Sequence, residues 1–309
     1  MSVAVIPRFQ RYVMLVGRII MGIGAVVTPL LRSYAIMASS ISDRPRAIAE
    51  IIGARALGVA IGPSFLNNFL DCYNLEIRIA PIYSATMFNW TRSELTLYTS
   101  IALSAFGIVA TFIYFGYKAC KMDRWIDQRI AFIVGIFAII LFFLITFPWW
   151  GLKKKIIYQQ EIIWINGTET QNPDPSGCKR SFKWCEYTPA VDPLVYNIGF
   201  VVLIGTAFPI LDISLNTIYS TIIGPRHQSV KQGLMALFGS WARFTGPVIL
   251  PSIFTLYGPR IVWLFNIVVA GASLVLWIAF YKKLVPCKDV TKLSRGDVVR
   301  TKFGYIYRL

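Results

Sequence analysis

Three charged side chains stand inside long apolar stretches of this chain of 309 residues: Arg18, Asp212 and Arg243. A charge at membrane depth is costly unless it meets a partner, a substrate or water. A carboxylate and two guanidinium groups held in this way can bind an anion, pass a proton or neutralise one another. The sequence therefore predicts that these residues line the substrate or coupling path of a membrane protein.

The residues themselves leave alternatives open for two members of this set. Arg18 either takes part in the path or lies near the membrane edge, where its long side chain reaches the headgroups. Asp212 either belongs to a proton or cation relay or neutralises a nearby arginine. Arg32 and Arg55 add positive charge, so arginines outnumber carboxylates, and a cavity lined in this way favours anions.

The sequence contains few of the residue combinations that enzyme active sites use. His227 is the only histidine, so neither a nucleophile with a histidine base nor a histidine-bearing metal cluster can be assembled. No glycine-rich phosphate loop of P-loop spacing occurs. We therefore expect no enzyme activity, no cofactor and no metal site.

The composition indicates an integral membrane protein. Hydrophobic residues make up 56% of the chain and charged residues 15%, and the mean hydropathy is +0.58. A helix needs roughly 20 apolar residues to cross a bilayer. Seven blocks meet this length: 12–37, 48–70, 95–117, 130–150, 194–220, 233–256 and 260–282. A shorter apolar segment, 77–90, is expected to lie at the interface or to re-enter the membrane.

The excess of basic over acidic residues is also consistent with an integral membrane protein. The formal net charge is +16, and the basic residues lie in turns between apolar blocks and in the C-terminal tail. That distribution is typical of membrane edges and unlike a compact basic domain. The lipid bilayer and a small solute or ion are the expected partners, and nucleic acid is not.

One long polar connection, 151–193, sets the expected orientation. It contains a glycosylation sequon at Asn166 together with Cys178 and Cys185, and glycans and disulfides belong to the lumenal or outer face. Because few residues separate the two cysteines, we expect them to form a disulfide. A second sequon, at Asn89, falls on the same side. Counting spans from this loop places the basic turns and the tail in the cytosol, as the positive-inside rule requires.

Small residues and Gly-Pro pairs mark the predicted helix contacts. Small residues let helices approach closely, and a proline distorts the helix that contains it. Both Gly-Pro pairs follow a basic turn and an arginine, so the blocks 39–63 and 223–247 resemble each other in pattern. The predicted packing residues are Gly22, Gly24, Gly58, Gly62, Pro63, Gly246 and Pro247.

Several motifs resemble a known family. Arg18-xxx-Gly22-x-Gly24, the turn Asp43-Arg44-Pro45-Arg46 and Gly58-xxx-Gly62-Pro63 are similar to the fourth and fifth spans of major facilitator superfamily transporters. Later motifs resemble the lysosomal branch of that family: Trp184-Cys185-Glu186-Tyr187-Thr188-Pro189, Ala242-Arg243-Phe244-Thr245-Gly246-Pro247 and Tyr257-Gly258-Pro259-Arg260. The similarity covers most of residues 12–283.

The resemblance implies an all-α polytopic membrane protein. The family has twelve spans, so the expected fold is an incomplete major facilitator superfamily helical bundle with about seven full spans and one short segment. Four regions are implied: 1–75 as the remnant of an N-terminal half with two spans, 76–94 as a short apolar segment at the lumenal side, 95–283 as a C-terminal half with five spans and the loop 151–193, and 284–309 as a basic cytosolic tail.

The implied function is transport of a small anion or a proton-coupled solute across the lysosomal or late endosomal membrane. One alternative is a non-transporting fragment or incomplete gene product of such a transporter. A seven-span receptor is a less favoured alternative. Asp43-Arg44 resembles a receptor motif, but it follows the first span, whereas receptors carry theirs after the third.

Overall fold

The structure is a computed structural model, and it describes residues 27–39, 43–69, 79–120, 126–152, 154–159, 162–165, 168–172, 176–223, 229–284, 298–301 and 304–307. Its elements are, in chain order, α2 (Val27–Ala38), α3 (Arg44–Phe69), α4 (Ile79–Phe88), α5 (Arg92–Ala119), α6 (Gln128–Ile145), β1 (Ile162–Ile165), β2 (Thr168–Gln171), η2 (Lys183–Cys185), α7 (Pro193–Gly199), η3 (Phe200–Ile204), α8 (Gly205–Ile223), α9 (Ser229–Tyr257), α10 (Pro259–Phe280), η4 (Tyr281–Lys283), β3 (Val298–Thr301) and β4 (Gly304–Tyr307).

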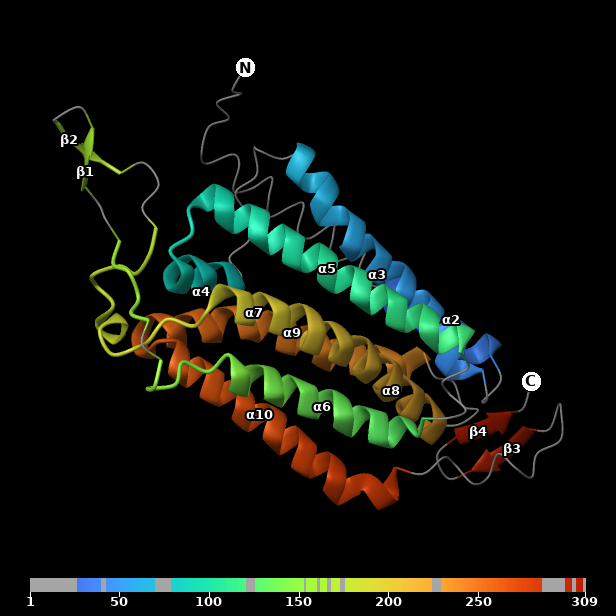
Figure 1. The fold of residues 1–309 in the computed structure, drawn as a ribbon. Helices are drawn as coiled ribbons and strands as arrows, with labels where there is room; N and C mark the ends of the chain where they lie inside the picture. Colours follow the sequence, from blue (N-terminus) through green and yellow to red (C-terminus); the bar gives the residue numbers. More distant parts are fainter. Residues whose placement is uncertain are drawn as a thin grey trace, which may run out of the picture.

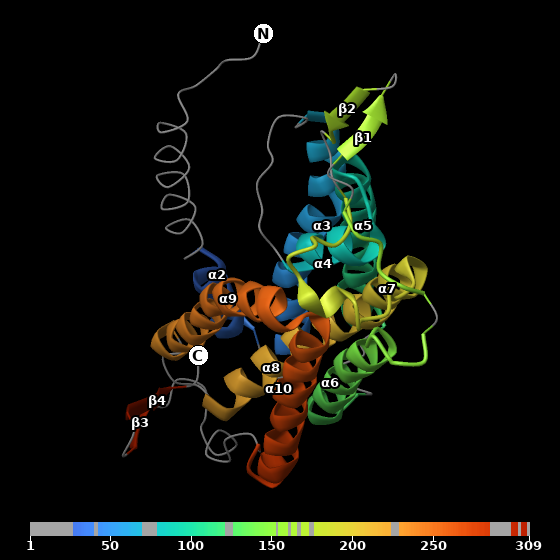
Figure 2. The ribbon, with the colours of Figure 1, turned by 90° about the vertical axis from the view of Figure 1, so that its left-hand side faces the viewer.

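The long helices form a bundle in which α8 has a central position (Figure 1). α3 packs along α5, α6 packs against both α8 and α10, and α5 joins the two groups through α8. α9 contacts α10, α2 and α4 (Figure 2). Two antiparallel hairpins, β1–β2 and β3–β4, lie outside the bundle, in the long loop and in the tail. The expectation of a helical fold therefore holds for the bundle, and the short strands were not predicted.

Four helices of the described part are long and apolar enough to cross a membrane. They are Arg92–Ala119, Gln128–Ile145, Pro193–Ile223 and Pro259–Lys283, and they coincide with four of the seven predicted spans. α3 and α9, with 26 and 29 residues, also exceed the roughly 20 residues that a crossing needs. Of the first predicted span, 12–37, only the end is described, as α2. The chain is an integral membrane protein, and these four helices are its candidate spans by length and composition.

The short apolar segment is a helix of 10 residues, α4, packed against α5 and α9. Within it, Tyr83 is fully buried and its ring stacks on Trp263 of α10, with centroids 4.4 Å apart. Phe254 and Tyr196 also contact the Tyr83 ring. Neighbouring helices thus cover one side of α4, as a half-span in an apolar medium requires.

Two hydrophobic clusters lie at opposite ends of the bundle. The loop-end cluster joins α4, the long loop, α9 and α10 through Tyr83, Met87, Ile156, Cys178, Trp184, Cys185, Ala190, Val191, Phe254, Val262 and Trp263. The tail-end cluster joins α2, α3, α5 and α8 through Ile36, Ile48, Ala49, Ile52, Ala56, Ala110, Tyr114, Tyr117 and Ile213. The polar residues described below lie beside the second cluster.

The predicted span 194–220 is not one regular helix. It begins as α7, passes through the π-helical turn η3 and continues as α8, which contains Pro209. A π-helical turn holds one more residue than an α-helical turn and is often found at functional sites. The sequence pattern gave no sign of this change, because hydrophobicity continues through it without a break.

Among the described glycines of the helices, the closest contacts with a neighbouring helix are at Gly107 and Gly135. A Cβ atom built on Gly58 or Gly246 meets nothing within 4 Å, so neither glycine is at a helix contact in the part of the chain that the structure describes. A Cβ on Gly107 would lie 2.6 Å from the backbone of Ala60, and one on Gly135 would lie 2.7 Å from Leu211. The predicted Gly22 and Gly24 lie outside the described residues, as do the surroundings of Gly62, Pro63 and Pro247.

Candidate functional site

Arg32 of α2 forms an ion pair with Asp212 of α8. The guanidinium Nη2 lies 3.4 Å from Asp212 Oδ2, and the other terminal nitrogen, Nη1, donates to Asn216 Oδ1 at 3.4 Å. Asn216 Nδ2 in turn donates to Asp212 Oδ1 at 2.7 Å and to the Asp212 carbonyl at 2.6 Å. The three side chains form a closed polar triad between two helices that are 180 residues apart in sequence.

Helix geometry explains how α8 presents this triad. Asp212 and Asn216 are four residues apart, so they lie on one face of the helix, one turn above the other. Asn216 is fully buried, and the side chains of Arg32 and Asp212 keep only 18% and 17% of their surface exposed. The Nε of Arg32 is buried and has no hydrogen-bond partner among the described residues. The guanidinium therefore has bonding capacity that the triad itself does not use.

A second arginine ties the same helix to α3. Arg44, at the first position of α3, is buried and its Nη1 donates to the backbone carbonyl of Ser220 at 3.1 Å. Ser220 lies in the last turn of α8, where carbonyl groups have no partner within the helix. A cation at this end also complements the negative end of the helix dipole. Arg44 thus acts as a C-terminal cap supplied by another helix.

Two further hydrogen bonds link α8 to its neighbours. Ser214 donates to Gln128 Oε1 of α6 at 3.1 Å, and Tyr219 donates to the carbonyl of Lys231 in α9 at 2.8 Å. Together with the two arginine contacts, these bonds connect α8 to α2, α3, α6 and α9 within three turns of helix. Because α8 is bonded to all four helices, a movement of any one of them would be transmitted through α8 to the others.

The electrostatic balance of the site is positive. Arg32 and Arg44 contribute two cations, and Asp212 contributes one carboxylate, which already contacts Arg32. In a low-dielectric setting this excess attracts anions. Protonation of Asp212, or competition from an anion for Arg32, would remove the charge pair that links α2 to α8. The arrangement can thus couple binding of an anion or a proton to helix movement.

Of the predicted path residues, the structure assigns a partner to Asp212. The sequence left open whether this carboxylate neutralises an arginine, and the ion pair with Arg32 favours that alternative. Arg243 belongs to α9, but its side chain lies outside the described part, and Arg18 lies outside the described residues altogether. Arg32 was noted only as additional charge. The sequence feature that could have identified Arg32 as a site residue is its charge inside an apolar run. The next residue, Ser33, is buried.

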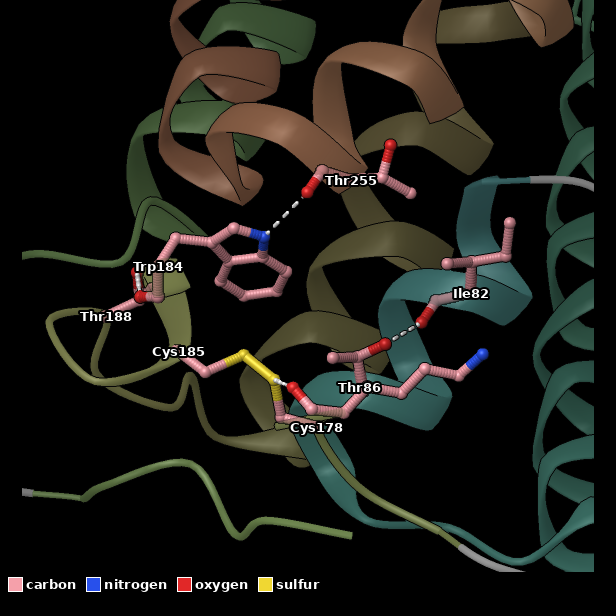
Figure 3. The surroundings of a disulfide bond; sticks show 8 residues. Ile82, Thr86, Cys178, Trp184, Cys185, Thr188 and Thr255 are labelled. Carbon is pink, nitrogen blue, oxygen red and sulfur yellow. Dashed lines mark hydrogen bonds between the residues drawn. A yellow bond between two sulfur atoms is a disulfide. The ribbon is translucent and has the colours of Figure 1, made fainter. Parts of the chain in front are cut away.

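The disulfide expected from the sequence lies at the other end of the bundle. Cys178 and Cys185 are joined and both are buried (Figure 3). Trp184, between them, donates from its indole Nε1 to the carbonyl of Thr255 in α9 at 3.4 Å, and its own carbonyl accepts from Thr188. Asn166 lies outside the described residues, and its sequon ends at Thr168, the first residue of β2. Among the residues that the structure describes, no group of three His, Cys, Asp or Glu is placed to hold a metal ion.

These features define a polytopic helical membrane protein with a buried polar triad at one end and a disulfide-closed loop at the other. The chain is similar to major facilitator superfamily domain-containing protein 8 of Xenopus laevis, with 25% identity over 380 residues that cover 90% of this chain and 73% of the relative. The alignment is longer than this chain, so it includes positions at which only the relative has a residue. No family model and no solved structure matches the chain.

Proposed function

We propose that the chain is a solute transporter of the major facilitator type, and that α2 and α3 represent its N-terminal half while α5 to α10 represent its C-terminal half. The similarity to the Xenopus laevis relative supports the class. The carrying observation is the triad of Arg32, Asp212 and Asn216, which joins the two groups of helices through a charge pair. A transporter of this kind moves solute by relative movement of its halves, and a breakable ionic contact between them is suited to that movement.

The proposed substrate class is a small anion or a solute that moves together with a proton. The excess of arginine over carboxylate at the site, with Arg32 and Arg44 against Asp212, supports the first, and the single carboxylate, Asp212, supports the second. Arg18 and Arg243 are proposed as further residues of the path, because each is a charge inside an apolar block. The lysosomal or late endosomal membrane is proposed as the location on the family resemblance.

The test is flux in proteoliposomes that contain a trapped pH-sensitive dye and a potential-sensitive dye. Chloride, acetate, succinate and phosphate are presented one at a time. We expect at least one of these anions to move, and we expect Arg32→Leu and Asp212→Asn each to reduce the initial rate at least about tenfold, which corresponds to 1.4 kcal/mol. Glu50→Gln is the matched control, since the Glu50–Lys118 pair is half exposed and is separate from the hydrogen bonds of the triad.

A folded protein that moves none of these anions and shows no proton flux would contradict the proposal and favour a non-transporting product. Unchanged rates in both triad variants would keep transport but remove the triad from its mechanism. Tagged protein that is found on membranes without a lysosomal or late endosomal marker would overturn the proposed location alone.

A further inference from the structure

The turn between α4 and α5 is a glycosylation sequon, Asn89-Trp90-Thr91, and all three of its side chains have structural contacts. Asn89 follows the last residue of α4 and has a φ of 55°, the one positive φ of a residue other than glycine in the described part of the chain. Helices commonly end on such a left-handed residue, and asparagine tolerates this conformation better than most side chains. Asn89 thus terminates α4.

The other two residues of the sequon fix the start of α5. Thr91 is its N-cap: the hydroxyl accepts from the Glu94 amide, and Glu94 Oε2 accepts from the Thr91 amide at 3.0 Å. This reciprocal arrangement is a capping box. The Trp90 ring lies between Phe88 and Tyr98, with ring centroids 4.8 and 4.7 Å away. The sequon is therefore folded into a tight junction between two helices.

Asn89 also holds the disulfide loop. Its Oδ1 accepts a hydrogen bond from the Ser176 hydroxyl at 3.0 Å. The next residue, Gly177, has a φ of 98°, and a Cβ built there would lie 2.8 Å from the same Oδ1 and 2.6 Å from the carbonyl of Ile157. The backbone of the loop is thus pressed against the Asn89 carboxamide, immediately before Cys178.

We propose that Asn89 is a latch that docks residues 176–185 onto the α4–α5 turn, and that it carries no glycan in the folded protein. A glycan is bulky and hydrophilic and is attached through the carboxamide nitrogen. That nitrogen is bonded to the same carbon as the oxygen that contacts Ser176 and faces Gly177, so a glycan on Asn89 would compete with the loop for the space beside this carboxamide. The sequon at Asn166 remains as the glycan acceptor of the long loop.

The consequence is a loop fixed at two helix junctions. Asn89 holds its start against the α4–α5 turn, and Trp184 holds its end against the α9–α10 turn, where a Cβ on Gly258 would lie 2.8 Å from the indole. The disulfide joins the two anchors at Cys178 and Cys185. α4 and α9 are thereby tied together outside the bundle, in addition to their direct contact.

The first measurement counts glycans on the chain expressed in animal cells, by gel mobility before and after treatment with a peptide glycosidase. We expect Asn89→Gln to keep the full mobility shift and Asn166→Gln to abolish it. A shift that persists in Asn166→Gln and disappears in the double variant would overturn the proposal. This measurement depends on the proposed orientation but not on transport.

The second measurement tests the latch without any glycan, in the Asn166→Gln background. Under limiting reductant, the rate at which Cys178 and Cys185 are alkylated is followed by peptide mass spectrometry. Ser176→Ala removes one hydrogen bond and should raise this rate about fivefold. Asn89→Gly should have a similar effect, because it keeps the left-handed conformation, and Asn89→Ala should have a larger one, because it loses both features.

Ser93→Ala is the matched control, since the Ser93 hydroxyl contacts Thr91 in the same turn and not the loop. Equal alkylation rates in the wild type, Ser176→Ala and Asn89→Ala would overturn the latch. Neither measurement involves solute flux, so failure here is distinguishable from failure of the proposed transport function.

Discussion

Gly107 of α5 lies directly against the backbone of Ala60 in α3, and a Cβ on this glycine would approach the Ala60 Cα and N to 2.6 Å. Two helix backbones can come this close only where one residue has no side chain. The contact sits in the α3–α5 pair, which is packed along its length. It is the clearest example in the bundle of a packing position that a small-residue motif did not identify.

We expect Gly107→Ala to destabilise the protein by about 1–3 kcal/mol, because the added methyl group overpacks the α3–α5 contact. Gly116→Ala is the control on the same helix, since a Cβ there meets nothing within 4 Å. The control should be neutral or stabilising by up to about 1 kcal/mol through helix propensity. The measurement is thermal unfolding of the purified protein in detergent, and equal melting temperatures for the two variants would contradict the prediction.

Arg32→Leu and Asp212→Leu should each be destabilising, because each leaves one charge partly buried without its partner. The double variant should recover part of this loss, with an interaction energy of about 0.5–3 kcal/mol in a double-mutant cycle. The same cycle on Glu50 and Lys118, whose side chains are 50% and 56% exposed, should give about 0–1 kcal/mol. Additive single losses in the first cycle would show that the two charges do not act as a pair.

Tyr83→Phe should stabilise the protein or leave its stability unchanged. The Tyr83 hydroxyl is buried and has no hydrogen-bond partner among the described residues, and an unpaired buried hydroxyl costs about 1–3 kcal/mol. The ring contacts with Trp263 are kept by phenylalanine. A clear loss of melting temperature would indicate that the hydroxyl has a partner, such as a bound water.

Arg243→Leu should abolish flux while expression persists, if the guanidinium meets an anion or a carboxylate in the path. Translocon scales put the cost of a mid-span arginine at roughly 2.5–3.5 kcal/mol, so a position without a function should tolerate leucine or gain stability from it. Restoration of flux by lysine would point to charge, and failure of lysine would point to the planar guanidinium. Undiminished flux in the leucine variant would remove Arg243 from the site.

The orientation predicts that a tag after Lys283 is digested by mild protease on intact vesicles and that the loop around Asn166 is spared. The reason is the placement of glycans and disulfides on the lumenal face and of basic tails in the cytosol. Opening the vesicles with detergent is the control, since it should expose the loop. Protection of the tail in intact vesicles would reverse the assignment.

The sequence was sufficient for features that depend on local composition. Apolar length predicted four helices that the structure shows to be long enough to cross a membrane, and the position of Cys178 and Cys185 close together in one polar loop predicted their pairing. Asp212 was recognised as a charge that needs a partner, because its cost depends only on its apolar surroundings.

The partners of these residues could not be predicted in the same way. Arg32 meets Asp212 across 180 residues of chain, and several arginines were equally able to supply the charge. Helix contacts at glycines could not be predicted for a similar reason. Gly58 fits a small-residue motif but faces open space, whereas Gly107 has no glycine four residues away on its helix and contacts Ala60. Which face of a helix meets another depends on the packing of the whole bundle, and a motif on one helix does not record it.

The π-helical turn η3 separates two parts of one span that are held by different neighbours. Tyr196, before it, is fixed in the aromatic contacts around Tyr83, while Asp212, after it, is fixed by Arg32. Each residue of an α-helix advances the helix by about 100° around its axis. If the extra residue of η3 were taken up into regular α-helical hydrogen bonding, α8 would turn by roughly that angle and move about 1.5 Å along its axis, which would carry Asp212 away from Arg32. Deleting one residue of η3 should therefore hold α8 in its present rotation.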